Sequence, residues 1–338
     1  MKILFLVKRF YPSIGGVEKH AFEVAKELAD RGDEITIVTE ENSIDSKLNF
    51  DNHKLRAKIY RIPVGESEKM KKFRIWKWFW KNRQLIKEAE IIHCHDVFYW
   101  YLPFRFLFPN KPVFITFHGW EGKFPIPQKN LFMRKIGEKL SYGNICIGEY
   151  LKKWYGTKTD FISYGGVRLE KEKSNRKEQN KIVFVGRLEK DTGLPIYLKL
   201  FKILKKKKVN FEIEFYGDGS LRKEAEKYGK VFGFTDNAYS KISSAGIVFA
   251  SSYLAILEAL SLKKAVISVY DNPLKKDYLF DSPFRNYLVL NSDPRKLAEE
   301  MIFLLKNNKE NLKGYDWARK QSWEKVTDLY LKLWGRNT

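Results

Sequence analysis

The chain has little cysteine and no long apolar run. Its 338 residues include two cysteines, Cys94 and Cys146, which excludes a disulfide framework and favours buried thiols in a reducing compartment. No stretch reaches the roughly 18 uncharged apolar residues that a membrane-spanning helix needs. The apolar residues 1–7 are followed at once by Lys8 and Arg9, so they are expected to form a core strand rather than a secretory signal.

Acidic residues are also scarce relative to basic ones. Lys and Arg number 63 and Asp and Glu 41, which gives a formal net charge of +22 at pH 7. The excess is not a terminal tail, because residues 1–168 and residues 169–338 each carry a net +11. A field of this sign attracts phosphate groups, whether they belong to nucleotides, nucleic acids or anionic lipids.

Short apolar runs alternate with helix-like stretches along the chain. In the first half, the runs that predict strands are residues 2–7, 34–39, 58–64, 91–95, 112–117, 144–147 and 161–163. In the second half, strands are predicted at residues 182–185, 211–216, 230–232, 246–250 and 265–269. Continuous apolar strands separated by helices are typical of α/β folds with parallel sheets.

A charged segment divides this pattern into two parts. Residues 169–181 contain no Val, Ile or Phe, which predicts an inter-domain linker. The sequence therefore predicts a doubly wound domain over residues 1–168 and a second over 182–315, with a final helix at 316–335. Open parallel sheets bind ligands at the carboxyl ends of their strands, so two such domains would face each other across a binding cleft.

Two motifs of the first half point to a ligand. Gly15 and Gly16 stand between a strand and a helix, where the backbone can approach a phosphate or sugar closely and free N–H groups are available. His118 directly follows a predicted strand, where its ring could bind a sugar hydroxyl or a developing charge. The alternatives are an ordinary tight turn for the glycines and a capping or core role for the histidine.

Two motifs of the second half suggest an anion site. Arg187 follows a buried strand, and its forked guanidinium matches a pyrophosphate, to which Lys190 can add a point charge. Two serines, Ser251 and Ser252, are suited to cap the next helix, whose first amides, from Tyr253 on, would point at an anion. The alternative for Arg187 is an ordinary surface arginine.

An acidic residue lies farther along the same helix. Glu258 has otherwise apolar surroundings in the sequence. Because an unpaired buried charge is costly, its carboxylate is expected to have a hydroxyl-rich partner such as a ribose. The alternative is a glutamate that faces solvent.

Taken in order, these motifs resemble the family 4 retaining glycosyltransferases, which have the GT-B fold of two Rossmann-like domains. The resemblance covers nearly the whole chain. It rests on the segments YPSIGGVEKH, GDEITIVT, IIHCHD, TFHG, FVGRLEKDTG, YGDG, SSYLAILEAL and SWEKVTDLYLKLW. The last segment is similar to the family's C-terminal helix, which packs back on the first domain.

The resemblance implies a function. It is the transfer of a sugar, with retention of configuration, from a UDP- or GDP-type nucleotide sugar bound by the second domain to an acceptor bound by the first. No metal or cofactor is implied. The catalytic residues implied are His118, Arg187 and Lys190. The donor-binding residues implied are Gly15, Gly16, Arg187, Lys190, Gly233, Ser252, Tyr253, Leu254 and Glu258, with Arg187 at the diphosphate, Glu258 at the ribose and residues 232–234 at the base.

Two positions depart from the family pattern. Ala250 stands where the family usually has a second glutamate near the donor sugar, and Ser251 and Ser252 are the nearest hydrogen-bonding groups. Thr192 stands where the family usually has a lysine, and we hypothesise that Lys190 supplies the missing charge. A relative that binds a donor but catalyses weakly is therefore an alternative.

A basic aromatic segment predicts contact with a membrane. Residues 69–87 hold eight basic side chains and no acidic one, interleaved with aromatic residues. As a helix in an anionic interface, the segment would place the protein in the cytoplasm, peripheral at the inner face of the cell membrane, beside a lipid-linked acceptor or glycan precursor. The alternative is a helix packed on its domain with solvated lysines. The residues expected at the membrane are Lys71, Lys72, Phe73, Arg74, Trp76, Lys77, Trp80 and Lys81.

Three rival interpretations remain at this stage. A basic α/β protein could bind RNA, although no RNA-binding module is evident and no nucleic-acid partner is expected. Another GT-B enzyme, such as a nucleotide-sugar epimerase or an inverting transferase, would share the same motifs. His93 and His95 are alternate residues of one strand and could both bind a metal, although one buried and one capping histidine is the simpler expectation.

Overall fold

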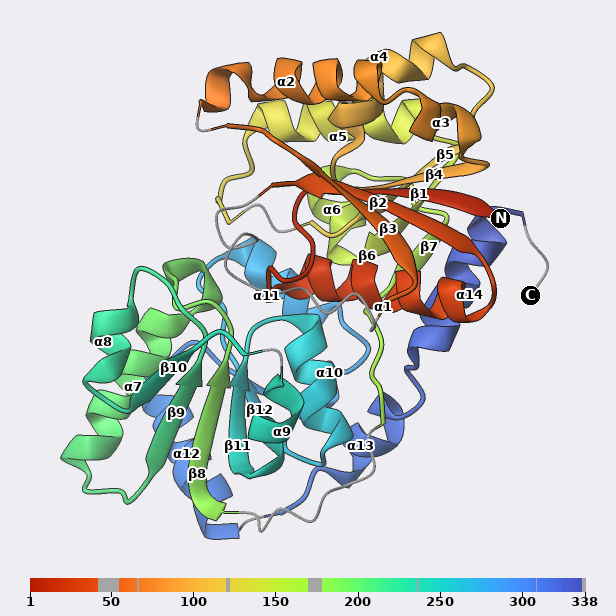
Figure 1. Ribbon diagram of the computed structural model, residues 1–338. Coiled ribbons are helices and arrows are strands. Elements are labelled where there is room, and N and C mark those ends of the chain that lie inside the picture. The colour runs from red at the N-terminus through yellow and green to blue at the C-terminus, as the bar shows by residue number, and fades with distance from the viewer. Residues whose placement is uncertain are drawn as a thin grey trace. The chain divides into compact units, whose positions relative to one another are not determined.

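A computed structural model describes residues 1–41, 55–65, 67–119, 122–169, 178–235, 237–307 and 309–335 (Figure 1). The chain divides into two compact units. Unit 1 comprises Met1–Ser163 with Trp323–Thr338, and unit 2 comprises Tyr164–Ser322. Each unit is built on one parallel sheet with helices on both faces, so the predicted α/β class is confirmed.

Unit 1 contains a seven-stranded sheet in the order β3-β2-β1-β4-β5-β6-β7. All the pairings are parallel, and β1, β4, β5 and β6 are buried on both faces, which is why their sequences are continuous apolar runs. The predicted strands are all present. Their bounds are β1 Lys2–Val7, β2 Glu34–Glu40, β3 Ala57–Ile62, β4 Ile91–His95, β5 Val113–Phe117, β6 Gly143–Ile147 and β7 Phe161–Ser163.

Helices cover both faces of this sheet. In Figure 1, α2, α4 and α5 lie over one face, and α1 and α14 lie along the other. The helix α4 is rich in aromatic residues, and its Trp100, Tyr101 and Phe104 are buried. Most of its aromatic side chains therefore belong to the core of unit 1. The helices are α1 Gly16–Asp30, α2 Glu68–Lys81, α3 Gln84–Glu88, α4 Phe98–Leu107, α5 Gln128–Leu140, α6 Tyr150–Tyr155 and α14 Trp323–Leu333.

Unit 2 contains a six-stranded parallel sheet in the order β10-β9-β8-β11-β12-β13. Its strands are β8 Glu178–Val185, β9 Glu212–Tyr216, β10 Lys230–Gly233, β11 Ala245–Ala250, β12 Ala265–Ser268 and β13 Leu288–Leu290. One face packs on α7 Leu194–Lys206 and α12 Pro294–Asn307, and the other on α9 Ala238–Ser243, α10 Tyr253–Ser261 and α13 Leu312–Ala318 (Figure 1). Shorter elements complete the unit: α8 Arg222–Glu226, α11 Pro273–Phe280 and the 3-10 turns Lys190–Thr192 and Arg285–Tyr287.

Two predicted boundaries are wrong. β8 begins at Glu178, so residues 178–181 belong to a strand and not to the predicted linker, while residues 170–177 of that linker lie outside the described residues. The predicted final helix 316–335 is broken into α13 and α14. The break follows from a long-range pairing, because Ser322 forms a parallel bridge with Val167 and the Val167 amide donates to the carbonyl of residue 321 at 2.8 Å.

An aromatic cluster forms much of the core of unit 2. Phe201 on α7 is fully buried, and its ring stacks on Phe211 at 5.7 Å and on Phe249 at 5.5 Å between centroids. Phe249 in turn stacks on Tyr197 at 4.6 Å. Because offset and edge-on ring pairs add to the burial of apolar area, this cluster fixes α7 on the sheet.

We expect Phe201→Ala to lower the free energy of unfolding by about 3–5 kcal/mol, because it removes a buried ring and leaves a cavity among the rings that surround it. The measurement is urea denaturation followed by circular dichroism. The matched control is Lys202→Ala, which changes the exposed neighbour on the same helix and should stay within about 0.5 kcal/mol of the parent. Equal stabilities for the two variants would contradict this account of the core.

Candidate functional site

Four of the five histidines of the chain gather in unit 1. His93 and His95 point from β4, His118 follows β5, and His20 comes from α1. The ring centroids of His20 and His118 are 5.0 Å apart, and those of His95 and His118 are 5.4 Å apart. His20, His93 and His95 are at most 2% exposed. The cluster therefore lies at the carboxyl ends of central strands, where an open parallel sheet binds its ligand.

A chain of hydrogen bonds orders part of this cluster. The Trp334 indole Nε1 donates to Nδ1 of His93 at 3.2 Å, and Nε2 of His93 lies 2.8 Å from the Thr116 hydroxyl. That hydroxyl is 2.7 Å from the Tyr330 hydroxyl, which is 2.9 Å from Nε2 of His20. An indole N–H can only donate, so a neutral His93 must accept at Nδ1 and donate from Nε2. Every hydroxyl proton then has an acceptor if Thr116 donates to Tyr330 and Tyr330 donates to His20.

Burial keeps the clustered histidines neutral. Desolvation lowers the pKa of His20 to about 3 and holds the pKa values of His93, His95 and His118 well below the usual range, with repulsion from neighbouring rings adding to the effect. His118 can therefore exchange hydrogen bonds with a ligand at neutral pH, but it brings no positive charge. Its Nε2 lies 3.1 Å from Nδ1 of His95.

The loop that carries His118 is held by Asp96. The His118 amide lies 3.1 and 3.2 Å from the two Asp96 carboxylate oxygens, and Asp96 has a φ of +60°. Arg134 reaches the same carboxylate at 3.7 Å and lies 4.6 Å above the ring of Phe117. These contacts connect the ends of β4 and β5 and so fix where the His118 ring lies.

The histidine cluster does not favour a metal. His93 and His95 share a face of β4, but the hydrogen bonds of their rings go to Thr116, Trp334 and His118. Among the described residues, no group of three or more His, Cys, Asp or Glu side chains could hold an ion.

The glycine pair lies at the start of α1, as expected. Gly15 is extended, with a φ of −176°, and its carbonyl accepts the Lys19 amide at 3.0 Å. Gly16 is exposed, and a Cβ built on it would meet no atom within 4 Å. The backbone surface over Gly16 is therefore open, which is the geometry that close approach of a ligand requires.

In unit 2, the turn after β8 exposes two cations. The Arg187 side chain is 53% exposed and pairs with Asp191 at 2.5 Å, and Lys190 is exposed in the adjoining 3-10 turn. Thr192 is nearly buried, and its hydroxyl donates to the carbonyls of Arg187 at 3.0 Å and Glu189 at 2.8 Å. Thr192, which stands at the family's lysine position, therefore stabilises its own turn and offers no positive charge to a ligand.

The N-terminus of α10 faces this turn. The Ser251 hydroxyl donates to the Thr192 carbonyl at 2.5 Å, while Ser252, the N-cap residue, is exposed. The expectation that the Tyr253 amide is open to an anion is wrong, because that amide donates to the Tyr278 hydroxyl at 2.9 Å. The rings of Tyr253 and Tyr278 stack with 3.9 Å between their centroids. The Tyr278 hydroxyl therefore occupies the place that was expected for a ligand oxygen. Leu254 is half-buried in the first turn.

Glu258 is buried on the same helix, with 7% of its surface exposed, so the solvent-facing alternative is wrong. Ala250, at the end of β11, is fully buried and its carbonyl accepts the Ser268 hydroxyl at 2.6 Å. The position of the family's second glutamate therefore carries no group that could contact a sugar.

Sequence reasoning missed Lys275. It lies on α11, is 5% exposed, and its Nζ donates to the Ser251 carbonyl at 2.5 Å. No helix was predicted there, although Asn272 followed by Pro273 is a start signal, and the Asn272 side chain does accept the Lys275 amide at 2.9 Å. Leu274, Lys275, Tyr278 and Leu279 form the buried side of α11, which a helical pattern drawn from that signal would have shown.

Two exposed rings flank Gly233 at the end of β10. Gly233 has a φ of +80°, and Phe232 and Phe234 are 44% and 51% exposed. Phe232 stacks on Tyr216 with 5.0 Å between the centroids. Exposed aromatic faces on an ordered strand end are suited to stacking against a nucleotide base.

The basic aromatic segment splits between an inner and an outer side of α2. Phe79, one of the aromatic residues of this segment, is buried against Trp100 and Phe104. The structure also gives internal partners to three of the residues expected at a membrane. Lys71 pairs with Glu40 at 2.8 Å, Arg74 donates to the Val64 and Ser67 carbonyls, and Trp76 donates to the Tyr99 carbonyl at 2.9 Å.

The outer side of α2 keeps both apolar rings and charges. Phe73 is 48% and Trp80 54% exposed, and the Lys72 ammonium lies 4.9 Å from the Phe73 ring centroid. Lys77 and Lys81 are exposed beside them. We call these five residues the outer α2 surface. No helix in the described part of the chain is long and apolar enough to cross a bilayer.

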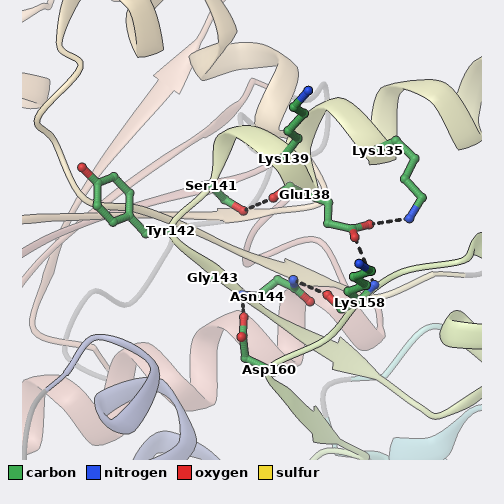
Figure 2. A pocket seen from close by; sticks show the side chains of 9 residues that line it. All are labelled: Lys135, Glu138, Lys139, Ser141, Tyr142, Gly143, Asn144, Lys158 and Asp160. Carbon is green, nitrogen blue, oxygen red and sulfur yellow. Dashed lines mark hydrogen bonds and ion pairs between the residues drawn. The ribbon is translucent and has the colours of Figure 1, made fainter.

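Unit 1 has a hollow of about 490 Å³ at the amino end of β6, and Figure 2 shows the side chains that line it. Three of its charged side chains have partners within unit 1, since Lys135 binds Glu138 at 3.0 Å and Asp160 accepts the Asn144 amide at 2.8 Å. The hollow lies at the end of the sheet opposite His118. Its lining residues are Lys135, Glu138, Lys139, Ser141, Tyr142, Gly143, Asn144, Lys158 and Asp160.

Comparisons with known proteins cover both halves of the chain. The Glycosyltransferase Family 4 model matches residues 14–157, and the Glycosyl transferases group 1 model matches residues 167–321. An uncharacterized glycosyltransferase of Methanocaldococcus jannaschii is 24% identical over 397 residues, which span 99% of this chain and 98% of that protein. The GDP-mannose:cellobiosyl-diphosphopolyprenol alpha-mannosyltransferase of Xanthomonas campestris is 28% identical over 123 residues, 35% of this chain and 31% of that protein.

A solved structure shows the same fold. A variant of TarM from S. aureus, crystallised with UDP and two other ligands, superimposes with a TM-score of 0.75 at 14% identity, over 98% of this chain and 99% of that one. The GT-B fold expected from the sequence is thereby confirmed.

We expect unit 1 to be sensitive to acid through its histidines. Their pKa values are lower in the folded than in the unfolded chain, so the unfolded state takes up more protons and stability falls as pH drops below about 6.5. His20→Phe removes one such group. Between pH 7 and pH 4 the variant should lose less unfolding free energy than the parent, by on the order of 3 kcal/mol. Urea denaturation at the two pH values measures the difference, and equal losses would contradict the prediction.

Proposed function

We propose that this chain, which belongs to the family 4 glycosyltransferases, transfers a sugar from a UDP- or GDP-type nucleotide sugar with retention of configuration. The observation that carries the proposal is the joint placement, in unit 2, of Arg187 after β8 and the buried Glu258 on α10. A cation for a diphosphate and a carboxylate for ribose hydroxyls are the two recognition groups that such a donor requires. UDP is a ligand of the S. aureus TarM variant.

The chemical task of unit 2 is to stabilise the departing nucleoside diphosphate. Negative charge grows on the diphosphate as its bond to the sugar breaks, and preorganised cations lower the barrier most when they act on that charge. The half-exposed Arg187 guanidinium can turn from Asp191 to a diphosphate, and Lys190 adds a second cation from the same turn. The donor site is completed by Ser252 and Leu254 at the N-terminus of α10 and by Gly233 beside the nucleotide base.

The task of unit 1 is to bind the acceptor and the transferred sugar. The neutral His118 ring can accept a hydrogen bond from a sugar hydroxyl or donate one to it, and the open backbone over Gly16 allows close approach of the sugar.

Retention of configuration distinguishes this proposal from an inverting transferase or an epimerase, so the anomeric configuration of the product is the deciding observation. Membership of a glycosyltransferase family accounts for the motifs, which RNA binding would leave unexplained.

The acceptor is proposed to be lipid-linked, or a glycan precursor held at an anionic membrane. The support is the outer α2 surface, where two half-exposed rings stand among lysines on one side of a helix whose other side is anchored by Ile75 and Phe79. The aromatic rings would insert into the membrane interface while the lysine ammonium groups contact anionic headgroups. Each ammonium group contributes about 1 kcal/mol to the binding free energy. The name of the Xanthomonas relative includes a diphosphopolyprenol acceptor. A peripheral position at the inner face of the cell membrane follows from the same surface.

We expect Arg187→Ala to lower the rate of sugar transfer by about 100- to 1000-fold, because it removes one preorganised donor to the leaving group. The assay supplies UDP- and GDP-sugars with a membrane extract as acceptor and follows label in the glycan fraction. Lys202→Ala, on the far end of α7, is the control and should retain full activity. If Arg187→Ala transfers sugar at a near-parental rate, the diphosphate site has been misassigned.

We also expect the chain to sediment with anionic vesicles at low salt. Replacing Phe73 and Trp80 together with serine should weaken that binding at least tenfold, because the inserted rings are lost while the charge is unchanged. Phe303→Ser is the matched control, since Phe303 is an equally exposed ring, at 57%, on α12 of unit 2. Absence of parental binding, or an equal effect of the control, would overturn the membrane proposal.

A further inference from the structure

Lys275 is a buried cation on α11 of unit 2. Its side chain lies on the inner side of α11, where Nζ donates to the Ser251 carbonyl at 2.5 Å and stands 4.1 Å from the Tyr278 ring centroid. Within the described residues it makes no ion pair with a carboxylate. An ammonium has three N–H groups, so one carbonyl and one ring face do not satisfy it.

Such an arrangement is unfavourable to folding. Removing an ammonium from water costs several kcal/mol unless an anion compensates. Desolvation lowers the pKa of Lys275 to about 8, and the more distant Asp191 and Asp271 offset only part of that effect, while Arg187 adds to it. A methionine would fill the same volume without this penalty. Uncompensated charge of this kind is characteristic of sites that bind a ligand.

The surroundings of Lys275 are those of the proposed donor site. Ser251, its carbonyl acceptor, donates its own hydroxyl to Thr192, the residue at the family's lysine position. Tyr278, one helical turn beyond Lys275, caps the Tyr253 amide at the start of α10. The ammonium therefore lies beside a helix N-terminus, and the partial positive charge of that terminus adds to the demand for an anion.

We propose that Lys275 binds the diphosphate of the nucleotide donor and, together with the exposed Lys190, takes the place of the lysine that Thr192 lacks. This inference rests on the proposed function. Two N–H groups of Nζ remain for phosphate oxygens while the third stays on the Ser251 carbonyl. The cation comes from a different element than in the family pattern, because the threonine closes its own turn and α11 brings a buried lysine to the same place.

If Lys275 binds the diphosphate, the affinity for the nucleotide should depend on pH. Only the charged ammonium binds a diphosphate well, so nucleotide affinity should fall as Lys275 loses its proton above pH 8. The titratable and charged groups around it are Arg187 and Asp191 from the β8 turn, Asp271 before α11, and Tyr278 and Tyr253. Burial raises the pKa of Tyr278, so that ring stays neutral between pH 7 and pH 9.

The experiment is calorimetric titration of the full chain with UDP and with GDP at pH 7.0 and pH 9.0. We expect Lys275→Met to weaken the better-binding nucleotide about tenfold or more at pH 7.0. The parent should lose close to tenfold in affinity between the two pH values, and Lys275→Met should change little. Lys276→Met, the exposed neighbour on the same helix, should resemble the parent at both pH values.

Thermal melting separates binding from a structural role. Because the methionine variant removes a desolvated charge, its melting temperature at pH 7.0 should equal or exceed that of the parent. Should it fall instead, Lys275→Gln, which is neutral but polar, replaces it in the titrations.

Each remaining outcome decides the question. Parental affinity in Lys275→Met, while Arg187→Ala binds weakly, would overturn this inference and leave the proposed function standing. A weakened variant that keeps the parental pH dependence would overturn it as well. A parent that binds neither nucleotide would overturn both.

Discussion

In both units, polar side chains are buried close to the carboxyl ends of strands. A buried donor or acceptor without a partner costs about 1–3 kcal/mol, so each must find one within its unit or in a ligand. In unit 1 the contacts from Trp334 to His20 satisfy part of the histidine cluster internally, whereas Nε2 of His95 has no hydrogen-bond partner among the described residues. Unit 2 leaves Lys275 with one carbonyl and a ring face, and there the missing partner is expected from outside.

Features that depend on local sequence were predicted correctly. Strands buried on both faces are continuous apolar runs, so the central strands of both sheets could be placed without knowledge of their neighbours. The burial of Glu258 was predicted for the same reason, because its neighbours along α10 are apolar on every side of the helix. The start of α1 at the glycine pair likewise needed no distant contact.

Features that depend on distant partners were not predicted. The split between α13 and α14 follows from Ser322 pairing with Val167, more than 150 residues earlier in the chain. Lys71 was expected at a surface, but it binds Glu40 on β2, a strand that precedes both β3 and α2 in the chain. Lys275 owes its importance to the Ser251 carbonyl, and spacing along the sequence carries no sign of that contact. In each case the residue type was visible but its partner was not.

The order of hydrogen bonds in unit 1 has a consequence for proton movement. Conduction along such a row requires every member to reverse its orientation in turn, and an indole nitrogen cannot accept a proton from its neighbour. With Trp334 at one end, the row is a fixed dipole and not a relay. The tautomer of His20 is therefore set from a residue near the far end of the chain, with its Nε2 lone pair occupied and its proton held on Nδ1.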